Sequence, residues 1–275
     1  MFVEPETMRL SSAAHGTQIA FIVLGSVLLL IWIIRRVKYP QKLSLKNTPG
    51  RLNVLTPLHV ISIFLLWLLM KDSVKYAFTW MALEKEQAML YGNILSQIIT
   101  LGPLLVLGHV CFRGGLSRGL GVSMRHWGFD TIRGIYGGLA VFPVCIGLLA
   151  LCTLLIAFFR PESVESHLML KILRNTGTIG KLAVAFSTMI LAPLVEELLF
   201  RGMLQSMLRR YLMNPWLGIV ITTGIFSLFH LQTPQGIPSL FVLGGVLGYN
   251  YEQCGRLLPA ILIHMVFNGI LILLH

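Results

Sequence analysis

The sequence predicts an all-α fold, a polytopic membrane helix bundle of about eight transmembrane helices. Charged residues make up only 12% of the 275 residues, which is about half of their share in soluble globular proteins. Hydrophobic residues make up 55%. The third observation is that the chain divides into apolar stretches, most of them close to the length that crosses about 30 Å of hydrocarbon. We therefore expect an integral multi-pass membrane protein.

Eight apolar stretches are separated by short segments that hold the charged and turn-forming residues. In chain order they cover 18–34, 55–70, 88–112, 134–159, 182–208, 216–231, 237–251 and 257–275. Glu4 and Glu6 precede the first stretch and Arg35 and Arg36 follow it. A secretory signal peptide has the opposite order, with basic residues first, so we expect the first stretch to be a retained span.

The net charge of +11 raises the class of nucleic-acid-binding proteins, but the basic residues lie in short segments between the apolar stretches. That distribution is typical of the positive-inside bias of membrane loops, and we expect no nucleic-acid partner. Segments that follow the odd-numbered stretches hold 14 of the 22 Lys and Arg residues. The bias predicts that these segments are cytoplasmic and that both termini lie outside, an arrangement compatible with the cell (inner) membrane.

Two adjacent carboxylates and an arginine interrupt the fifth apolar stretch. Glu197 and Arg201 are four residues apart and share one helical face. Glu196 points about 100° away from Glu197 because a helix has 3.6 residues per turn. Arg201 can therefore neutralise Glu197 and leave Glu196 available for chemistry. The alternative is a structural ion pair close to the membrane edge.

Three further polar side chains interrupt the sixth and eighth stretches, namely His230, His264 and Asn268. Counted at 1.5 Å per residue from the basic ends of their helices, they and Glu196 fall within about two turns of one level. A charged or polar group in hydrocarbon is costly, so we expect them to meet in an interior, water-filled cavity of the C-terminal half. The alternatives are an interfacial histidine at 230 and an interhelical hydrogen-bonding pair at 264 and 268.

The residue types in this set suit the activation of water for hydrolysis. A carboxylate with two imidazoles can act on a water molecule as a general base. The same groups, Glu196, His230 and His264, could instead bind a divalent metal such as zinc, which acidifies its bound water. The second imidazole and the Asn268 amide could stabilise the oxyanion that forms on a carbonyl. The HExxH pattern is absent, so a metal site would be assembled from separate helices, and both schemes remain open.

These residues also carry a resemblance. "EELLFR" (196–201), "FSLFH" (226–230) and "HMVFN" (264–268) follow one another in the chain. They are similar to the EExxxR, FxxxH and HxxxN/D motifs of the CPBP family, the intramembrane proteases that include the type II CAAX prenyl endopeptidases and bacteriocin-processing-like proteins. The resemblance implies a catalytic core over 181–275, preceded over 1–180 by transmembrane helices and loops that match no motif.

The resemblance also implies roles for the residues. Glu196 would be the base on the attacking water with His230 assisting, His264 and Asn268 would bind the water or the oxyanion, and Glu197 and Arg201 would support the site. Both metal-dependent and metal-free mechanisms are proposed for the family. The implied partners are membrane lipid and a protein or peptide substrate in or at the membrane, prenylated or not.

Two other classes of function compete with the peptidase. A non-catalytic scaffold, or a bacteriocin-immunity or regulatory protein, could keep the same residues as a structural polar network. A proton-coupled transporter would also bury Glu and His. Transporters predict two similar halves with broken helices, whereas the polar residues noted here lie only in the second half, which disfavours that class.

Overall fold

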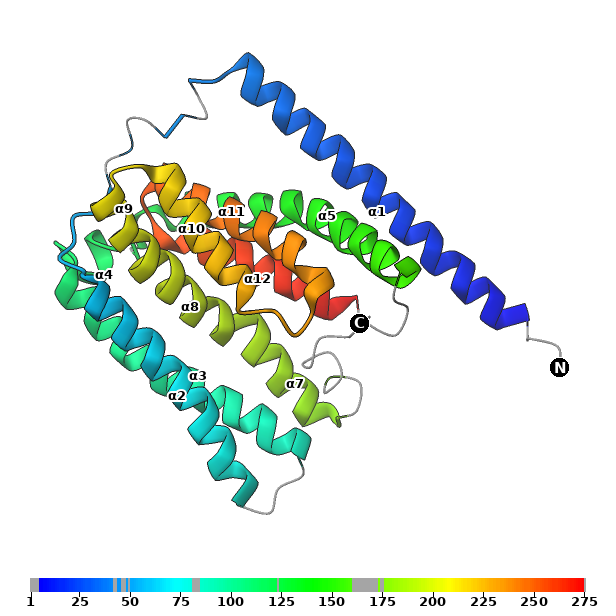
Figure 1. The fold of residues 1–275 in the computed structure, drawn as a ribbon, viewed down its shortest axis with the longest axis horizontal. Coiled ribbons are helices and arrows are strands. Elements are labelled where there is room, and N and C mark those ends of the chain that lie inside the picture. The colour runs from blue at the N-terminus through cyan, green and yellow to red at the C-terminus, as the bar shows by residue number, and fades with distance from the viewer. Residues whose placement is uncertain are drawn as a thin grey trace.

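The computed structural model describes residues 5–41, 44–45, 48, 50–80, 85–122, 124–159, 173 and 176–274, and almost all of this chain is helical (Figure 1). The long elements are α1 (Pro5–Lys38), α2 (Pro57–Trp80), α3 (Lys85–Cys111), α5 (Trp127–Phe159), a continuous helical run from Thr178 to Leu212, α10 (Pro215–Leu228), α11 (Ile237–Cys254) and α12 (Leu257–Leu273). Within the described ranges, the only β pairing is an isolated antiparallel bridge between Asn53 and Phe112. The predicted all-α class is confirmed.

Each apolar stretch predicted from the sequence overlaps one of these helices, but the bounds differ. α10 ends at Leu228, three residues before the predicted end, whereas several other helices are longer than predicted. α2 continues to Trp80, ten residues past the predicted end, and α5 begins at Trp127, seven residues before the predicted start. Hydropathy marks the part of a helix that needs lipid, whereas backbone hydrogen bonding continues through polar residues at either end. The predicted connection over 160–180 lies largely outside the described residues.

Four helical segments are long and apolar enough to cross a membrane by length and composition, covering Pro57–Val74, Glu86–Cys111, Trp127–Phe159 and Thr178–Leu212. Shorter apolar helices cover 19–35, 215–228 and 257–273. Large apolar side chains also remain on the surface, as along one face of α2, where Leu58, Ile61, Leu65 and Leu69 are exposed. Apolar faces of this extent need a lipid covering, so the chain is a multi-pass membrane protein. The count of eight transmembrane helices stays a prediction.

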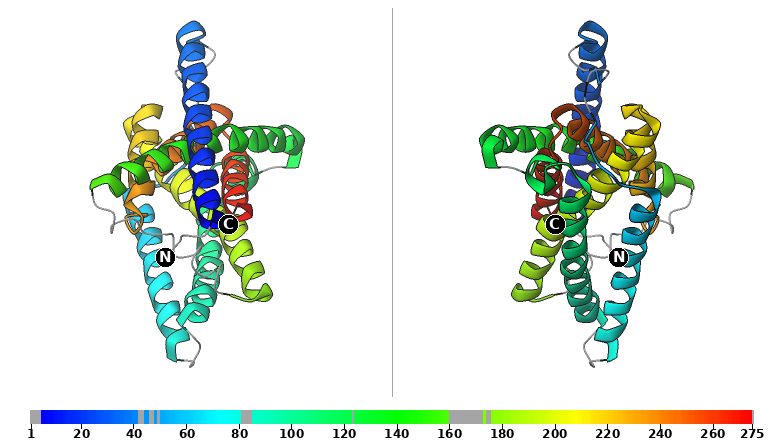
Figure 2. Two further views of the ribbon diagram at one scale, coloured as in Figure 1. Left: turned by 90° about the vertical axis from the view of Figure 1, so that its right-hand side faces the viewer. Right: turned by 90° about the vertical axis from the view of Figure 1, so that its left-hand side faces the viewer.

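The bundle has a centre and two flanks (Figures 1 and 2). The run 178–212, α10, α11 and α12 form the centre, and the antiparallel pair α2 and α3 packs on one side of it. α5 packs against α11 and α12 on the other side, and α1 lies outermost along α5. The run 178–212 and α12 carry five of the six predicted site residues, and the sixth, His230, follows the end of α10.

Glycines allow α5 to approach its neighbours closely. A Cβ atom on Gly138 would lie 2.6 Å from a methyl carbon of Val266 on α12. A Cβ atom on Gly147 would lie 2.8 Å from the carbonyl oxygen of Phe21 on α1. In lipid, where helices gain little hydrophobic free energy by associating, such small residues provide the van der Waals contact that holds helices together.

The basic segments between the helices gather at one end of the bundle. Arg51 Nη1 donates a hydrogen bond to the carbonyl of Arg118, and Arg209 Nη2 donates to the carbonyl of Thr48. The backbone N–H of Leu257 donates to the carbonyl of Leu120. The segments that the charge bias placed on one side of the membrane therefore share one end of the structure; the assignment of that end to the cytoplasm remains a prediction.

The run from Thr178 to Leu212 is not a uniform α-helix. It comprises α7 (Thr178–Phe186), the wider π-helical turn η3 (Ser187–Leu191), α8 (Ala192–Glu197), a second π-helical segment η4 (Leu198–Gln205) and α9 (Ser206–Leu212). Pro193 explains the first widening. Its ring clashes with the carbonyl four residues earlier and it has no N–H to donate, so the preceding turn opens. Both predicted glutamates lie on the short α-helix between the two π segments.

The α5–α12 contact yields a first prediction. Gly138→Ala should lower the free energy of unfolding by about 1–3 kcal/mol, because the added methyl overlaps Val266. Gly128→Ala on the same helix is a matched control, since a Cβ atom there meets nothing within 4 Å. Thermal unfolding of both variants in detergent measures the difference. Equal melting temperatures would show that α5 does not pack on α12 at this distance.

Candidate active site

Glu197 is the most deeply buried acidic group of the site. It ends α8, and its side chain has 0% exposure. Oε1 accepts hydrogen bonds from Arg201 Nη1 and from His264 Nδ1, each at 2.8 Å. The predicted i,i+4 pair of Glu197 and Arg201 is therefore confirmed, and α12 adds an imidazole that the sequence spacing could not place.

Glu196 faces the other side of the same imidazole. Its Oε2 lies 3.9 Å from His264 Nε2, and its side chain keeps 19% exposure. At that separation there is no direct hydrogen bond. His264 thus stands between two carboxylates, bonded to the buried one through Nδ1 and close to the accessible one through Nε2.

Arg201 contacts residues of three helices at the centre of the site. It is fully buried, and Nη2 donates to the carbonyl of Gly244 on α11 at 3.2 Å. Its guanidinium carbon lies 4.7 Å from the ring centre of Phe226 on α10, a cation–π contact. A Cβ atom on Gly244 would lie 3.2 Å from Nη2 and 2.9 Å from a methyl group of Thr223, so the absence of a side chain there lets the guanidinium reach the backbone.

Phe226 also connects the two imidazoles. The His230 ring lies 5.2 Å from its ring centre and the His264 ring 6.0 Å away, edge to face. His230 Nδ1 is 3.0 Å from the carbonyl of Phe226, four residues earlier in the chain. The structure thus places both predicted histidines around one buried aromatic ring, although His230 follows the end of α10 at Leu228.

Asn268 lies one turn after His264 on α12 and bonds to the opened turn η3. Ala192 N–H donates to the carbonyl of Ser187, five residues back, which is the π-helical pattern. The next donor in that pattern would be Pro193, which has no N–H, so the carbonyl of Thr188 lacks its helical partner. Asn268 Nδ2 donates to that carbonyl at 2.9 Å. The amide therefore ties α12 to the helix that carries the glutamates.

The site is thus assembled from four helical segments around His264 and Phe226. Glu196, Glu197 and Arg201 meet His264 or Phe226 directly, and His230 joins them through the Phe226 ring. In the part of the chain that the structure describes, no three His, Cys, Asp or Glu side chains converge as a metal-binding group. The set Glu196, His230 and His264 does not fit a metal ion as placed, and its role as a ligand set stays a prediction.

Three polar residues of the same interface, Gln205, Arg209 and Glu252, were not singled out from the sequence. Gln205 Nε2 donates to the carbonyl of Gly248 and to Glu252 Oε1, both at 3.1 Å, and Arg209 Nε lies 3.5 Å from Glu252 Oε2. We call this row the polar seam. It comprises Glu197, Arg201, Gln205 and Arg209 on one side and Gly244, Gly248 and Glu252 of α11 on the other. The signal in the sequence was the repeat of a polar residue at every fourth position after Glu197.

The prediction that polar residues lie only in the second half is wrong. On α3, Ser96, Gln97 and Thr100 are buried. Asn93 Nδ2 donates to the Ser187 hydroxyl, which in turn donates to Gln97 Oε1. α3 thus presents a polar face to η3, beside the site. The i,i+4 spacing of Asn93 and Gln97 inside an apolar stretch was the missed signal, and this part of the argument against a transporter falls away.

Helices long and apolar enough to cross a membrane, around a buried carboxylate, guanidinium and imidazole, define the class: an integral membrane protein with a polar site inside its helix bundle. Residues 178–270 match the family model described as Type II CAAX prenyl endopeptidase Rce1-like. The matched segment contains all three motifs. The resemblance to the CPBP family is confirmed over these residues.

A curated relative is similar over a shorter part. The chain is 39% identical over 79 residues to an uncharacterized 24.3 kDa protein of Escherichia coli. The match covers 28% of this chain and 36% of that protein, so it spans only about a third of the relative's length. No solved structure matches the chain.

The buried pair yields a second prediction. Arg201→Gln leaves Glu197 charged and short of its cation, which should lower the free energy of unfolding by about 3–5 kcal/mol. The double variant Glu197→Gln/Arg201→Gln removes both charges and should be more stable than Arg201→Gln alone. Melting temperatures of the single variants and the double variant in detergent measure this coupling. Additive losses would contradict a direct ion pair.

Proposed function

We propose that this protein is an intramembrane endopeptidase that hydrolyses a peptide bond with a water molecule activated by Glu196 and His264. The observation that carries the proposal is the position of one imidazole between two carboxylates of different burial. One carboxylate is closed off from solvent and orients the ring, and the other is accessible. That arrangement follows the logic of hydrolytic triads, in which a buried acid fixes the tautomer of a histidine.

The hydrogen bonds determine which ring nitrogen is basic. Glu197 Oε1 already accepts from Arg201, and a carboxylate that is ionised can only accept, so His264 Nδ1 carries the proton and donates. A neutral His264 then presents the lone pair of Nε2 toward Glu196. The same reasoning holds for His230, because the Phe226 carbonyl can only accept from Nδ1. Each histidine thus has one nitrogen available as a base.

The gap between Glu196 and His264 suits a bridging water. A separation of 3.9 Å is too long for a direct hydrogen bond and short enough for one water molecule to contact both groups. Glu196 would remove the proton as the water attacks the peptide carbonyl and would then transfer it to the leaving amine. His264 would hold the water in line.

Other groups of the site would stabilise the transition state. Glu197 Oε2 is buried and has no hydrogen-bonding partner among the described residues, so an internal water molecule could bond to it. We propose that His230 assists Glu196 and contacts the oxyanion in its protonated form. For Asn268, the bond to Thr188 supports a positioning role, and contact with the oxyanion or the water remains part of the proposal.

The substrate that we propose is a membrane-associated or prenylated, CAAX-type protein or peptide, in keeping with the family of residues 178–270. Aromatic rings next to the site support an apolar substrate. Phe229, next to His230, packs against Phe64 and Trp67 of α2 with ring centres 5.9 and 5.2 Å away, and 37% of Phe229 is exposed. The proposed location is the cell (inner) membrane, with lipid as the other partner and no nucleic acid.

The alternative is a non-catalytic scaffold or an immunity or regulatory protein that retains the same polar network. The buried pair of Glu197 and Arg201 fits that alternative equally well, since it is structural. Glu196 does not fit a purely structural network. Its carboxylate is accessible and lies beside the His264 imidazole, but it bonds directly to neither Arg201 nor His264. Glu196 therefore discriminates between the two functions.

A third prediction follows. Glu196→Gln should reduce cleavage of a prenylated peptide by purified protein about 100-fold or more while the melting temperature stays within error. His230→Ala should also reduce cleavage. Glu86→Gln, an exposed acid at the start of α3, controls for the loss of a charge. If cleavage, or the cellular phenotype, survives both Glu196→Gln and His230→Ala, the scaffold is the better description.

A fourth prediction separates the two schemes of water activation. A metal-free mechanism predicts that purified protein stays fully active in excess chelator and contains no stoichiometric metal. Elemental analysis and a chelator titration on the same sample measure both. Loss of activity that is restored by added zinc would instead support Glu196, His230 and His264 as metal ligands. In that case the three side chains would have to move closer together when the metal binds.

A further inference from the structure

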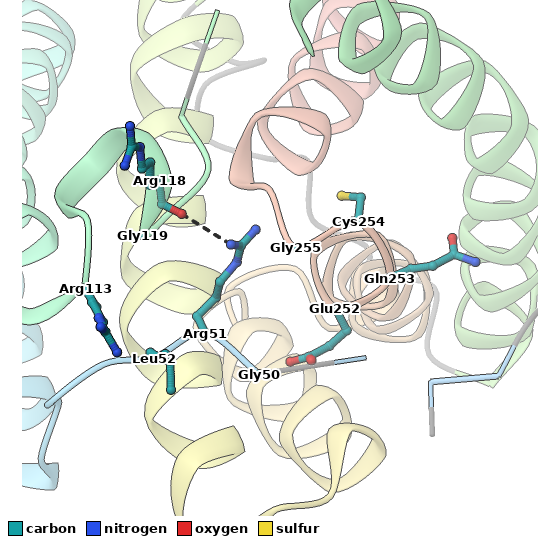
Figure 3. A pocket seen from close by; sticks show the side chains of 10 residues that line it. All are labelled: Gly50, Arg51, Leu52, Arg113, Arg118, Gly119, Glu252, Gln253, Cys254 and Gly255. Carbon is teal, nitrogen blue, oxygen red and sulfur yellow. Dashed lines mark hydrogen bonds between the residues drawn. The ribbon is translucent and has the colours of Figure 1, made fainter. Parts of the chain in front are cut away.

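A second polar region lies at the end of the bundle where the basic segments gather. It is a cavity of about 380 Å³, within the range of roughly 300–1,000 Å³ that small ligands occupy. Its lining comes from three parts of the chain that are distant in sequence: Gly50, Arg51, Leu52, Arg113, Arg118, Gly119, Glu252, Gln253, Cys254 and Gly255 (Figure 3). Glu252 contacts Gln205, two helical turns beyond Glu197, so the cavity is separated from the candidate active site by about 12 Å.

Positive charge is in excess around this cavity. The segments that meet here, 35–56, 113–133, 209–214 and 252–256, contain only two acidic residues, Asp130 and Glu252. Asp130 is held by Arg256, whose Nη2 lies 2.6 Å from Oδ1, and Glu252 is held by Gln205 and Arg209. Glu252 also interacts electrostatically with Arg51. Among the described residues, however, no carboxylate forms an ion pair with Arg51, Arg113 or Arg118.

Arg51 is held in the cavity by a hydrogen bond and has a donor that is free to bind an anion. Arg51 extends between Arg118 and Glu252 and donates from Nη1 to the carbonyl of Arg118 (Figure 3). Its Nε is buried without an acceptor among the described residues. A buried guanidinium donor without an acceptor is costly, so a bound anion would relieve it.

Gly255 makes room for this arrangement. It has a left-handed φ of +62°, and a Cβ atom there would lie 2.5 Å from Arg51 Nη2. Any other residue at 255 would both strain the backbone and displace the guanidinium. The turn between α11 and α12 therefore keeps Arg51 inside the cavity, beside Arg113 and Arg118.

We propose that this cavity binds a phosphate group, with Arg51, Arg113 and Arg118 as its ligands. Planar guanidinium groups pair with phosphate oxygens through two parallel hydrogen bonds. The guanidinium groups of Arg113 and Arg118 point away from Arg51 in Figure 3, and both side chains are exposed, so they would turn toward the bound phosphate. The cavity lies where helices end, and basic pockets between membrane helices are typical sites for anionic headgroups. The same chemistry would accept a soluble phosphate.

The test uses the full-length protein purified in a detergent with a neutral headgroup. It is incubated with phosphatidylglycerol or with phosphatidylcholine of the same acyl chains, and retained lipid is counted by native mass spectrometry. A third sample, with inorganic phosphate in place of lipid, measures binding from the rise in melting temperature. Arg113 and Arg118 are exposed, so the double variant Arg113→Gln/Arg118→Gln should fold. The matched control is Arg35→Gln/Arg125→Gln, with the same loss of charge from exposed positions outside the cavity.

We expect phosphatidylglycerol to be retained in preference to phosphatidylcholine. Binding of phosphatidylglycerol should be about tenfold or more weaker in the Arg113→Gln/Arg118→Gln variant and unchanged in the control. Stabilisation by inorganic phosphate alone, lost in the same variant, would support the site and assign it to a soluble ligand. Equal losses in variant and control, or no binding of either probe, would overturn the proposal. Because the readout is binding, its outcome is independent of whether the protein cleaves peptides.

Discussion

Glu197 is a fully buried carboxylate in the middle of a membrane helix bundle. The rest of the site depends on the ion pair and hydrogen bonds that compensate its negative charge. A charge at that depth is tolerated only where it is paired and hydrogen-bonded. Arg201 and His264 both bond to the same oxygen, and Arg201 in turn is held by the Gly244 carbonyl and the Phe226 ring. One ion pair thus fixes the relative positions of α8, α10, α11 and α12.

This constraint explains why the helices around the site contain irregular turns and glycines. The run that carries Glu196 and Glu197 opens into π-helical turns on both sides, and Pro193 accounts for the first. The opening leaves the Thr188 carbonyl to the Asn268 amide, and Gly244 and Gly248 leave room for Arg201 and Gln205 to reach the backbone of α11. A regular helix with larger residues would bring the same side chains past one another without contact.

The polar seam also relates the two regions of the molecule. It runs from Glu197 through Arg201 and Gln205 to Arg209 and Glu252, at the edge of the basic cavity. The seam and the lining of the cavity share Glu252. An anion bound among the arginines would therefore change the electrostatic potential at the Glu252 carboxylate. The physical connection is a row of hydrogen bonds and one ion pair between α11 and the segment from η4 to α9.

The sequence by itself determined the class of fold, because composition and apolar length reflect the solvent of each helix rather than its neighbours. It also determined the Glu197–Arg201 pair, since that pair follows from helical spacing within one segment. It identified the family through motifs that are local as well. The tertiary structure decided everything that depends on which helices touch. It placed His264 between Glu196 and Glu197, directed Asn268 to an opened turn, brought polar residues of α3 beside η3, and joined Arg51, Arg113 and Arg118 around one cavity. These contacts join residues from 67 to 94 positions apart in the chain, and helical periodicity carries no information across such separations.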